Sequence, residues 1–145
     1  IDKPAAHGIL HGKTYIPKES YRTISNLASL FSGDIKPKDE FLQVYLKKDG
    51  KCEYLQAEQF TFEKNSKPIY AYYFATPLDC ADELPYTATV KIYGTLQNPV
   101  LGDMYTGEAF EISDYRQYNG VTELNNLPVK NYPMVIAEKF CIETV

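Results

Sequence analysis

Hydrophobic and polar residues alternate in short runs from Glu40 onward, which is the two-residue period of strands with one buried face. The clearest run is Tyr86–Leu96. Its two faces separate cleanly into Ala88, Val90 and Ile92 on one side and Thr87, Thr89, Lys91 and Tyr93 on the other. Gly94 within this run predicts a bulge or bend, since glycine in a strand marks such irregularities. The pattern therefore predicts a half-buried strand that bends near its end.

Further strands are predicted where alternation or a continuous apolar run recurs. The residues concerned are 42–46, 52–57, 60–63, 69–75, 110–112, 121–125 and 133–145. The run 69–75 is almost wholly apolar or aromatic, as expected of a strand covered on both faces. Asp49-Gly50 and Asn119-Gly120 predict two-residue hairpin turns. We expect residues 98–107 to form a long connection and the acidic stretch 78–85 to form a loop.

One helix is predicted, near the N-terminus. Pro17 suits a first helical turn, and Gly33 suits the left-handed residue that ends a helix. Between them an apolar stripe recurs at steps of three and four residues, comprising Tyr21, Ile24, Leu27, Ala28 and Phe31. Pro37 blocks continuation. Residues 1–13 are small and weakly patterned, and we expect them to be flexible.

These elements predict one mainly β (α+β) domain covering residues 1–145, with seven or eight strands and an N-terminal helix. The absence of regular β-helix-β alternation argues against a doubly wound parallel sheet. We expect a small, closed or partly open antiparallel barrel of OB-like type, or a sandwich, because closure removes exposed strand edges.

Composition and charge narrow the class of function. The 145 residues include 13 Tyr and 7 Phe but no Trp, and aromatic residues favour pleated, half-buried surfaces. The formal net charge of -4 disfavours a general polyanion binder. No apolar stretch is long enough to predict a transmembrane segment. Ile1 follows no apolar leader, so we expect that a signal was removed or that Ile1 is a boundary of the chain.

The cysteines leave two alternatives open. Cys52, Cys80 and Cys141 are an odd number without short spacing, so neither a redox pair nor a zinc ribbon is predicted. One disulfide with a free thiol fits an oxidising compartment. Three reduced, buried thiols are the simpler interpretation, because a chain of this size does not require a disulfide.

No metal site, cofactor motif or nucleophilic triad is predicted. His7 and His11 have metal-ligand spacing for a helix, but glycines 8 and 12 disfavour a helix there. Asp79, Asp82 and Glu83 flank Cys80 and would suit acid–base work in a small hydrolase, although their spacing matches no calcium loop and a solvated loop is the simpler interpretation.

Two segments carry a family resemblance. The hairpin Tyr118–Asn126 and the strand Val90–Leu96, which is similar to a V-x-V-x-G-x-L pattern shifted by one place, resemble OB-fold-like modules of secreted bacterial proteins. Such modules accompany extracellular nucleases and the surface lipoproteins of gut-type bacteria. The family joins the two segments almost directly, whereas residues 97–117 intervene here. The resemblance implies an OB-type barrel, an exported protein (secreted, periplasmic or on the cell surface) and no catalytic residues.

Tyrosines are the main candidates for binding. We expect a ligand-binding surface around Tyr93, Tyr115 and Tyr118, with Tyr105 and Arg116 nearby, because tyrosine rings offer large rigid contacts with a polar end. This predicts a non-enzymatic module that binds a protein, a glycan or another ligand, and the resemblance implies that the module is extracellular. The alternative is an accessory module for single-stranded nucleic acid, in which aromatic rings stack on bases. Its cations would be Lys47, Lys48, Lys51, Lys91 and Arg116.

Overall fold

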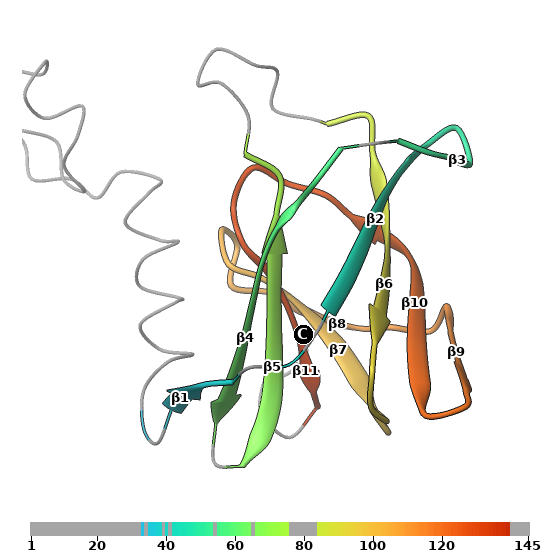
Figure 1. Ribbon diagram of the computed structural model, residues 1–145. Coiled ribbons are helices and arrows are strands. Elements are labelled where there is room, and N and C mark those ends of the chain that lie inside the picture. Colours follow the sequence, from blue (N-terminus) through green and yellow to red (C-terminus); the bar gives the residue numbers. More distant parts are fainter. Residues whose placement is uncertain are drawn as a thin grey trace, which may run out of the picture.

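Strands make up all the regular structure that the computed structural model describes, which covers residues 33, 35–38, 40, 42–53, 55–64, 66–75 and 84–139 (Figure 1). They are β1 (Ile35–Pro37), β2 (Leu42–Lys48), β3 (Lys51–Cys52), β4 (Glu58–Lys64), β5 (Lys67–Tyr73), β6 (Thr87–Ile92), β7 (Pro99–Asp103), β8 (Ala109–Glu111), β9 (Tyr115–Tyr118), β10 (Val121–Pro128) and β11 (Met134–Glu138). The predicted N-terminal helix and flexible start lie outside the described residues.

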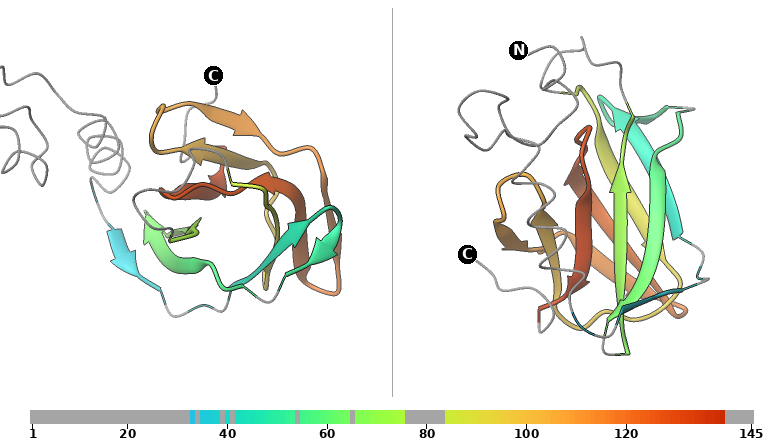
Figure 2. Two further views of the ribbon diagram at one scale, coloured as in Figure 1. Left: turned by 90° about the horizontal axis from the view of Figure 1, so that it is seen from above. Right: turned by 90° about the vertical axis from the view of Figure 1, so that its left-hand side faces the viewer.

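The strands form two antiparallel sheets. One has six strands in the order β1-β4-β5-β11-β7-β8, and the other has five in the order β3-β2-β6-β10-β9. Figure 2, left, shows the two sheets on opposite sides of a shared interior. The mainly β class with two antiparallel sheets is therefore confirmed. β11 is the last of the described strands yet lies inside the six-stranded sheet, between β5 and β7.

One apolar core fills the space between the sheets. The five-stranded sheet contributes alternate residues of β2, β6 and β10, and the six-stranded sheet contributes alternate residues of β5 and β11. Its largest fully buried members include Tyr72, Leu42, Leu46, Ile92, Leu124, Met134 and Ile136. The Tyr72 hydroxyl donates to the carbonyl of Pro128 at 2.7 Å, so the one polar atom of this ring is satisfied inside the core. Burial raises the pKa of the Tyr72 phenol.

Both predicted hairpin turns are confirmed. Asp49 and Gly50 have φ angles of 53° and 77°, and Asn119 and Gly120 have φ angles of 49° and 75°. Two successive positive φ angles define the turn whose twist matches the flanking strands, and Asn or Asp followed by Gly tolerates it. The first turn joins β2 to β3, and the second joins β9 to β10. The strand 69–75 is confirmed as β5, which is buried on both faces.

The closed barrel is wrong for the described residues, because no strand of one sheet pairs with a strand of the other. Closure would require the sheets to pair along both sides, β2 with β4 and β8 with β9, and neither pairing is present among the described residues. Part of the open edge of β2 is taken by β3, at Lys47 and Lys48, and part of the open edge of β4 by β1, from Phe62 to Lys64. Short outer strands thus protect the two edges without joining them.

Two further expectations are wrong, and a third is confirmed only in part. Residues 98–107 are not simply a connection, because β7 lies within them and pairs with both β11 and β8. Its two central apolar residues stand between Pro99 and Gly102, which read locally as turn residues, and tertiary pairing overrides that signal. The strand expected over 52–57 is reduced to β3. Gly94 lies in a bend after the end of β6 rather than within the strand, and its N–H donates to the Ile92 carbonyl at 3.0 Å.

Candidate functional site

The outer face of the five-stranded sheet carries the candidate site, and we call it the tyrosine face. Side chains alternate between the two faces of a strand. Leu42 and Leu46 of β2 and Ile92 of β6 point into the core, so the strand residues next to them point outward. The outward residues that define the tyrosine face are Gln43, Tyr45 and Lys47 of β2, Thr89 and Lys91 of β6, Tyr93 just after β6, Arg116 and Tyr118 of β9, and Glu123 of β10.

Strand register aligns four polar residues in a row across this face. Gln43 lies opposite Lys91, Lys91 opposite Glu123, and Glu123 opposite Arg116. Adjacent strands are about 4.8 Å apart, so the row spans about 14 Å. A surface of this width suits an extended ligand.

Two tyrosines share one amide at one end of the row. The hydroxyls of Tyr45 and Tyr93 donate to Gln43 Oε1 at 2.8 and 3.2 Å. Tyr45 is 36% exposed and Tyr93 is 50% exposed, so both rings are anchored at their polar ends while much of each ring is open to solvent. The Lys91 ammonium lies 5.5 Å from the centre of the Tyr45 ring, within the range of a cation–π contact.

Arg116, Tyr118 and Glu123 form a second group at the other end. Arg116 Nη2 lies 3.2 Å from both carboxylate oxygens of Glu123, and the Tyr118 hydroxyl donates to Oε2 of the same group at 2.8 Å. The guanidinium also lies 5.0 Å from the centre of the Tyr118 ring. The hydrogen bond from Tyr118, together with Arg116, lowers the pKa of the Glu123 carboxyl despite its burial. Glu123 is therefore ionised at neutral pH.

Thr122 holds the bend that presents Tyr93. Its side chain points away from the tyrosine face and is fully buried. The hydroxyl donates to the Gly94 carbonyl at 2.7 Å and accepts from the Leu96 N–H at 3.4 Å. The Gln117 amide donates to the Leu96 carbonyl as well. The position of Tyr93 thus depends on a hydrogen-bond network beneath the sheet surface.

The structure separates the five site residues predicted from sequence. Tyr93, Tyr118 and Arg116 lie together on the tyrosine face. Tyr115 lies opposite Leu124 in the register, packs against the core and donates its hydroxyl to the Gln97 carbonyl at 3.4 Å. Tyr105 follows β7 on the other sheet, where its ring centre is 5.5 Å from that of Tyr132. Tyr115 and Tyr105 therefore do not contribute to this face.

Sequence reasoning missed four members of the face as site residues, namely Gln43, Tyr45, Thr89 and Glu123. The alternation of β2 already assigns Gln43 and Tyr45 to one side of their strand. Nothing in the sequence shows that β2 lies beside β6, forty residues further along. The missing information was the order of strands in the sheet.

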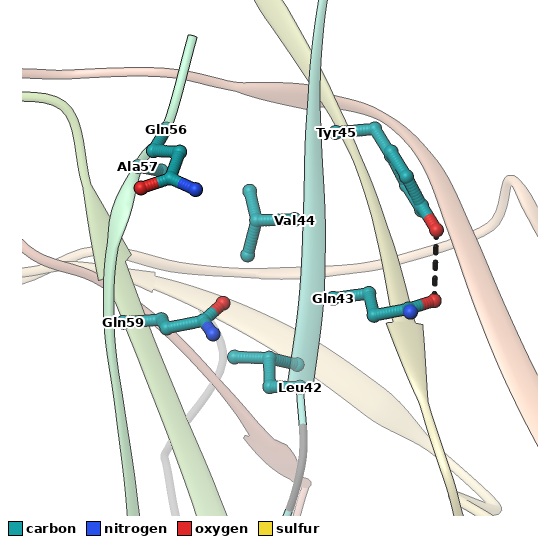
Figure 3. Close-up of a pocket in the computed structure, with 7 residues that line it drawn as sticks. All are labelled: Leu42, Gln43, Val44, Tyr45, Gln56, Ala57 and Gln59. Carbon is teal, nitrogen blue, oxygen red and sulfur yellow. Dashed lines mark hydrogen bonds between the residues drawn. The ribbon is translucent and has the colours of Figure 1, made fainter. Parts of the chain in front are cut away.

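A groove lies next to the tyrosine face, between β2 and β4. Its volume is about 320 Å³. In Figure 3, Leu42 and Val44 point from β2 toward Gln56 and Gln59, whereas Gln43 and Tyr45 point to the other side of the strand. The described lining consists of amide, apolar and phenol groups, without a carboxylate or thiol. The groove therefore offers hydrogen bonding but no described acid–base pair.

Several candidates lie outside the described residues. These are His7, His11, Cys80, Cys141 and the acidic residues Asp79, Asp82 and Glu83. Cys52 is an exposed free thiol. Within the described ranges, no three His, Cys, Asp or Glu side chains gather closely enough to hold a metal ion. In the same ranges, no helix has the length and apolar character needed to cross a membrane.

Comparison with known proteins identifies no family. No family model matches the sequence, and no curated protein is significantly similar to it.

Proposed function

We propose that this chain is a non-enzymatic extracellular binding module that holds a glycan on the tyrosine face. The observation that carries the proposal is the shared Gln43 amide, which fixes the rings of Tyr45 and Tyr93 by their hydroxyls while leaving much of each ring exposed. Rings that are already oriented lose little conformational entropy when a ligand stacks on them.

The polar groups between the rings favour a sugar over an apolar ligand. The Glu123 carboxylate provides an acceptor, and Lys91, Arg116 and the Gln43 amide nitrogen provide donors, all within one row of the sheet. Sugar hydroxyls both donate and accept hydrogen bonds, so a single sugar residue can bond to a carboxylate and to a cation at the same time. A protein ligand would also suit exposed tyrosine and arginine, because both are common at the centre of protein interfaces. The density of charged groups in the row favours the glycan.

Export and an OB-type relationship belong to the same proposal. The support for them is the resemblance of the hairpin Tyr118–Asn126 and the strand Val90–Leu96 to OB-fold-like modules of secreted bacterial proteins. An extracellular site, as in a surface lipoprotein or a secreted protein, also suits a module that binds glycans.

Single-stranded nucleic acid is the second candidate, because Lys47, Lys91 and Arg116 share the face with the three tyrosines. Alternating cations and aromatic rings suit a strand whose bases stack while its phosphates are neutralised. Against it, the Glu123 carboxylate lies in the middle of the row and is paired with Arg116. A phosphate backbone crossing the row would meet this negative charge.

The test is a binding screen with purified full chain. Neutral and acidic polysaccharides and a single-stranded oligonucleotide serve as probes, read by affinity electrophoresis and titration calorimetry. We expect retention by at least one polysaccharide. Tyr93→Ala and Tyr118→Ala should each weaken it about tenfold, since stacking on one aromatic ring contributes roughly 1–3 kcal/mol.

Tyr105→Ala is the matched control, because Tyr105 lies on the other sheet. It should leave affinity unchanged. Retention of the oligonucleotide alone, with an affinity that falls steeply with salt, would replace the glycan by the second candidate. Equal losses for all three variants would show that the tyrosine face is not the binding surface.

A further inference from the structure

The outer face of the six-stranded sheet is apolar, unlike the tyrosine face. Outward residues of β4 and β5 pair across the strands as Phe60 with Ala71 and Phe62 with Ile69. β11 adds Val135 and Ala137 to the same face, and β1 adds Ile35. Among the described residues, the charged side chains on this side lie at strand ends, as Lys64 and Lys67 do. An antiparallel sheet with one solvated face shows polar residues there, so this face is built to be covered.

The central part of this face is shielded from solvent. Ile69, Val135 and Ala137 have no exposed area, and they form a second buried cluster with Ala71 and Met104. Figure 2, right, looks toward this side of the molecule. Met104 is the buried member of the cluster that belongs to no strand. The strands that carry this cluster lie beneath it and cannot also cover it. A further apolar segment must therefore lie above the sheet at this point.

We propose that the cover is the N-terminal segment Tyr21–Phe31, which docks its apolar stripe on this face as an amphipathic helix. The segment lies outside the described residues, and its helical period comes from the sequence. It directly precedes β1, the edge strand of the same sheet, whose Ile35 packs against the buried cluster. A short connection therefore delivers the segment to the edge of this face.

The lengths match. Eleven helical residues span about 16 Å. The distance from β1 to β11 is three strand spacings, or about 14 Å. Phe60 is 46% exposed, so the cover stops short of that end of β4. The proposal is independent of the proposed function, since the tyrosine face belongs to the other sheet.

A double-mutant cycle in the full chain tests the contact. Leu27→Ala and Val135→Ala are made singly and together, and urea unfolding midpoints are measured by far-UV circular dichroism. Residues in contact couple, so we expect the double variant to lose less than the sum of the single losses. Asn26→Ala, off the apolar stripe, is the matched control and should be additive with Val135→Ala. Additivity for Leu27→Ala as well would overturn the proposal.

Two further measurements test the docking even if Val135→Ala does not fold. The chain has no Trp, so Phe31→Trp gives a single reporter, whose emission should be blue-shifted and protected from acrylamide. Water-like emission with full quenching would refute the docking. Sedimentation velocity should show a monomer. A dimer that dissociates when Ile69 is substituted would mean that a second copy covers the face, provided that this dissociation leaves the emission of Phe31→Trp unchanged.

Discussion

Thr122→Val gives a direct measure of the network that presents Tyr93. The substitution keeps the shape of the side chain and removes the hydroxyl, which donates to Gly94 and accepts from Leu96. Losing a net hydrogen bond costs about 1 kcal/mol, and leaving the Gly94 carbonyl without its partner adds about 1 kcal/mol more. Because Thr122 is fully buried, water does not replace the hydroxyl. We therefore expect the free energy of unfolding to fall by about 2 kcal/mol.

The assay is urea unfolding followed by circular dichroism, with Thr89→Val as the matched control. Thr89 is also buried, but its hydroxyl donates to the side chain of Asn125 at 3.2 Å, and a partly exposed side chain can turn to water. The control should lose less than about 1 kcal/mol. Binding by the folded Thr122→Val variant should weaken too, since the bend that carries Tyr93 is released. Equal losses for both variants, or an unchanged unfolding midpoint for Thr122→Val, would refute this reasoning.

Three other substitutions or conditions have expected outcomes. Glu138→Ala removes a carboxylate that accepts hydrogen bonds from two backbone N–H groups at 2.7 and 2.9 Å. The free energy of unfolding, measured in urea, should fall by about 3 kcal/mol. A loss below about 1 kcal/mol would show that the two bonds are dispensable. The lowered pKa of Glu123 means that its contribution is complete above its unfolded pKa and is lost as pH falls through the folded value. The stability difference between the native chain and Glu123→Gln should accordingly shrink in acid, and a difference independent of pH would contradict the assigned pairing. Gly120→Ala places a side chain at a φ of 75° and should cost about 1 kcal/mol in thermal unfolding, whereas a neutral result would mean that the turn relaxes.

The sequence pattern predicted those parts of the fold that depend on residues close together in the chain, namely turns and single strands. The Asn119-Gly120 and Asp49-Gly50 turns, the two-faced strand β6 and the doubly buried β5 are all present where alternation and turn residues indicate. β7 was missed because two of its five residues, Pro99 and Gly102, are typical of turns. Its pairing with β8 and β11 cannot be read from the sequence. The closed barrel failed for the same reason, since the protection of two strand edges by β1 and β3 is a property of the assembled sheets.

The candidate site shows the same division. Arg116 and Tyr118 share one short strand, and Tyr93 follows β6 on the side of its polar face, so each could be singled out along the chain. Their common surface depends on β10 lying between β6 and β9. Tyr115 is three residues from Tyr118 and points the other way because strand neighbours at odd separations face opposite sides. Sequence proximity alone was a poor guide there.

The place of β11 in the six-stranded sheet has a consequence for how the chain folds during synthesis. β11 pairs with β5 and β7, so it separates the two halves of its sheet. Until Glu138 has left the ribosome, β5 and β7 each have an unsatisfied edge, and the β4–β5 and β7–β8 hairpins have no common partner. Domains usually fold as units as they emerge, and this sheet is not complete until β11, the last described strand, has been made. Two open strand edges are available for aggregation in the meantime.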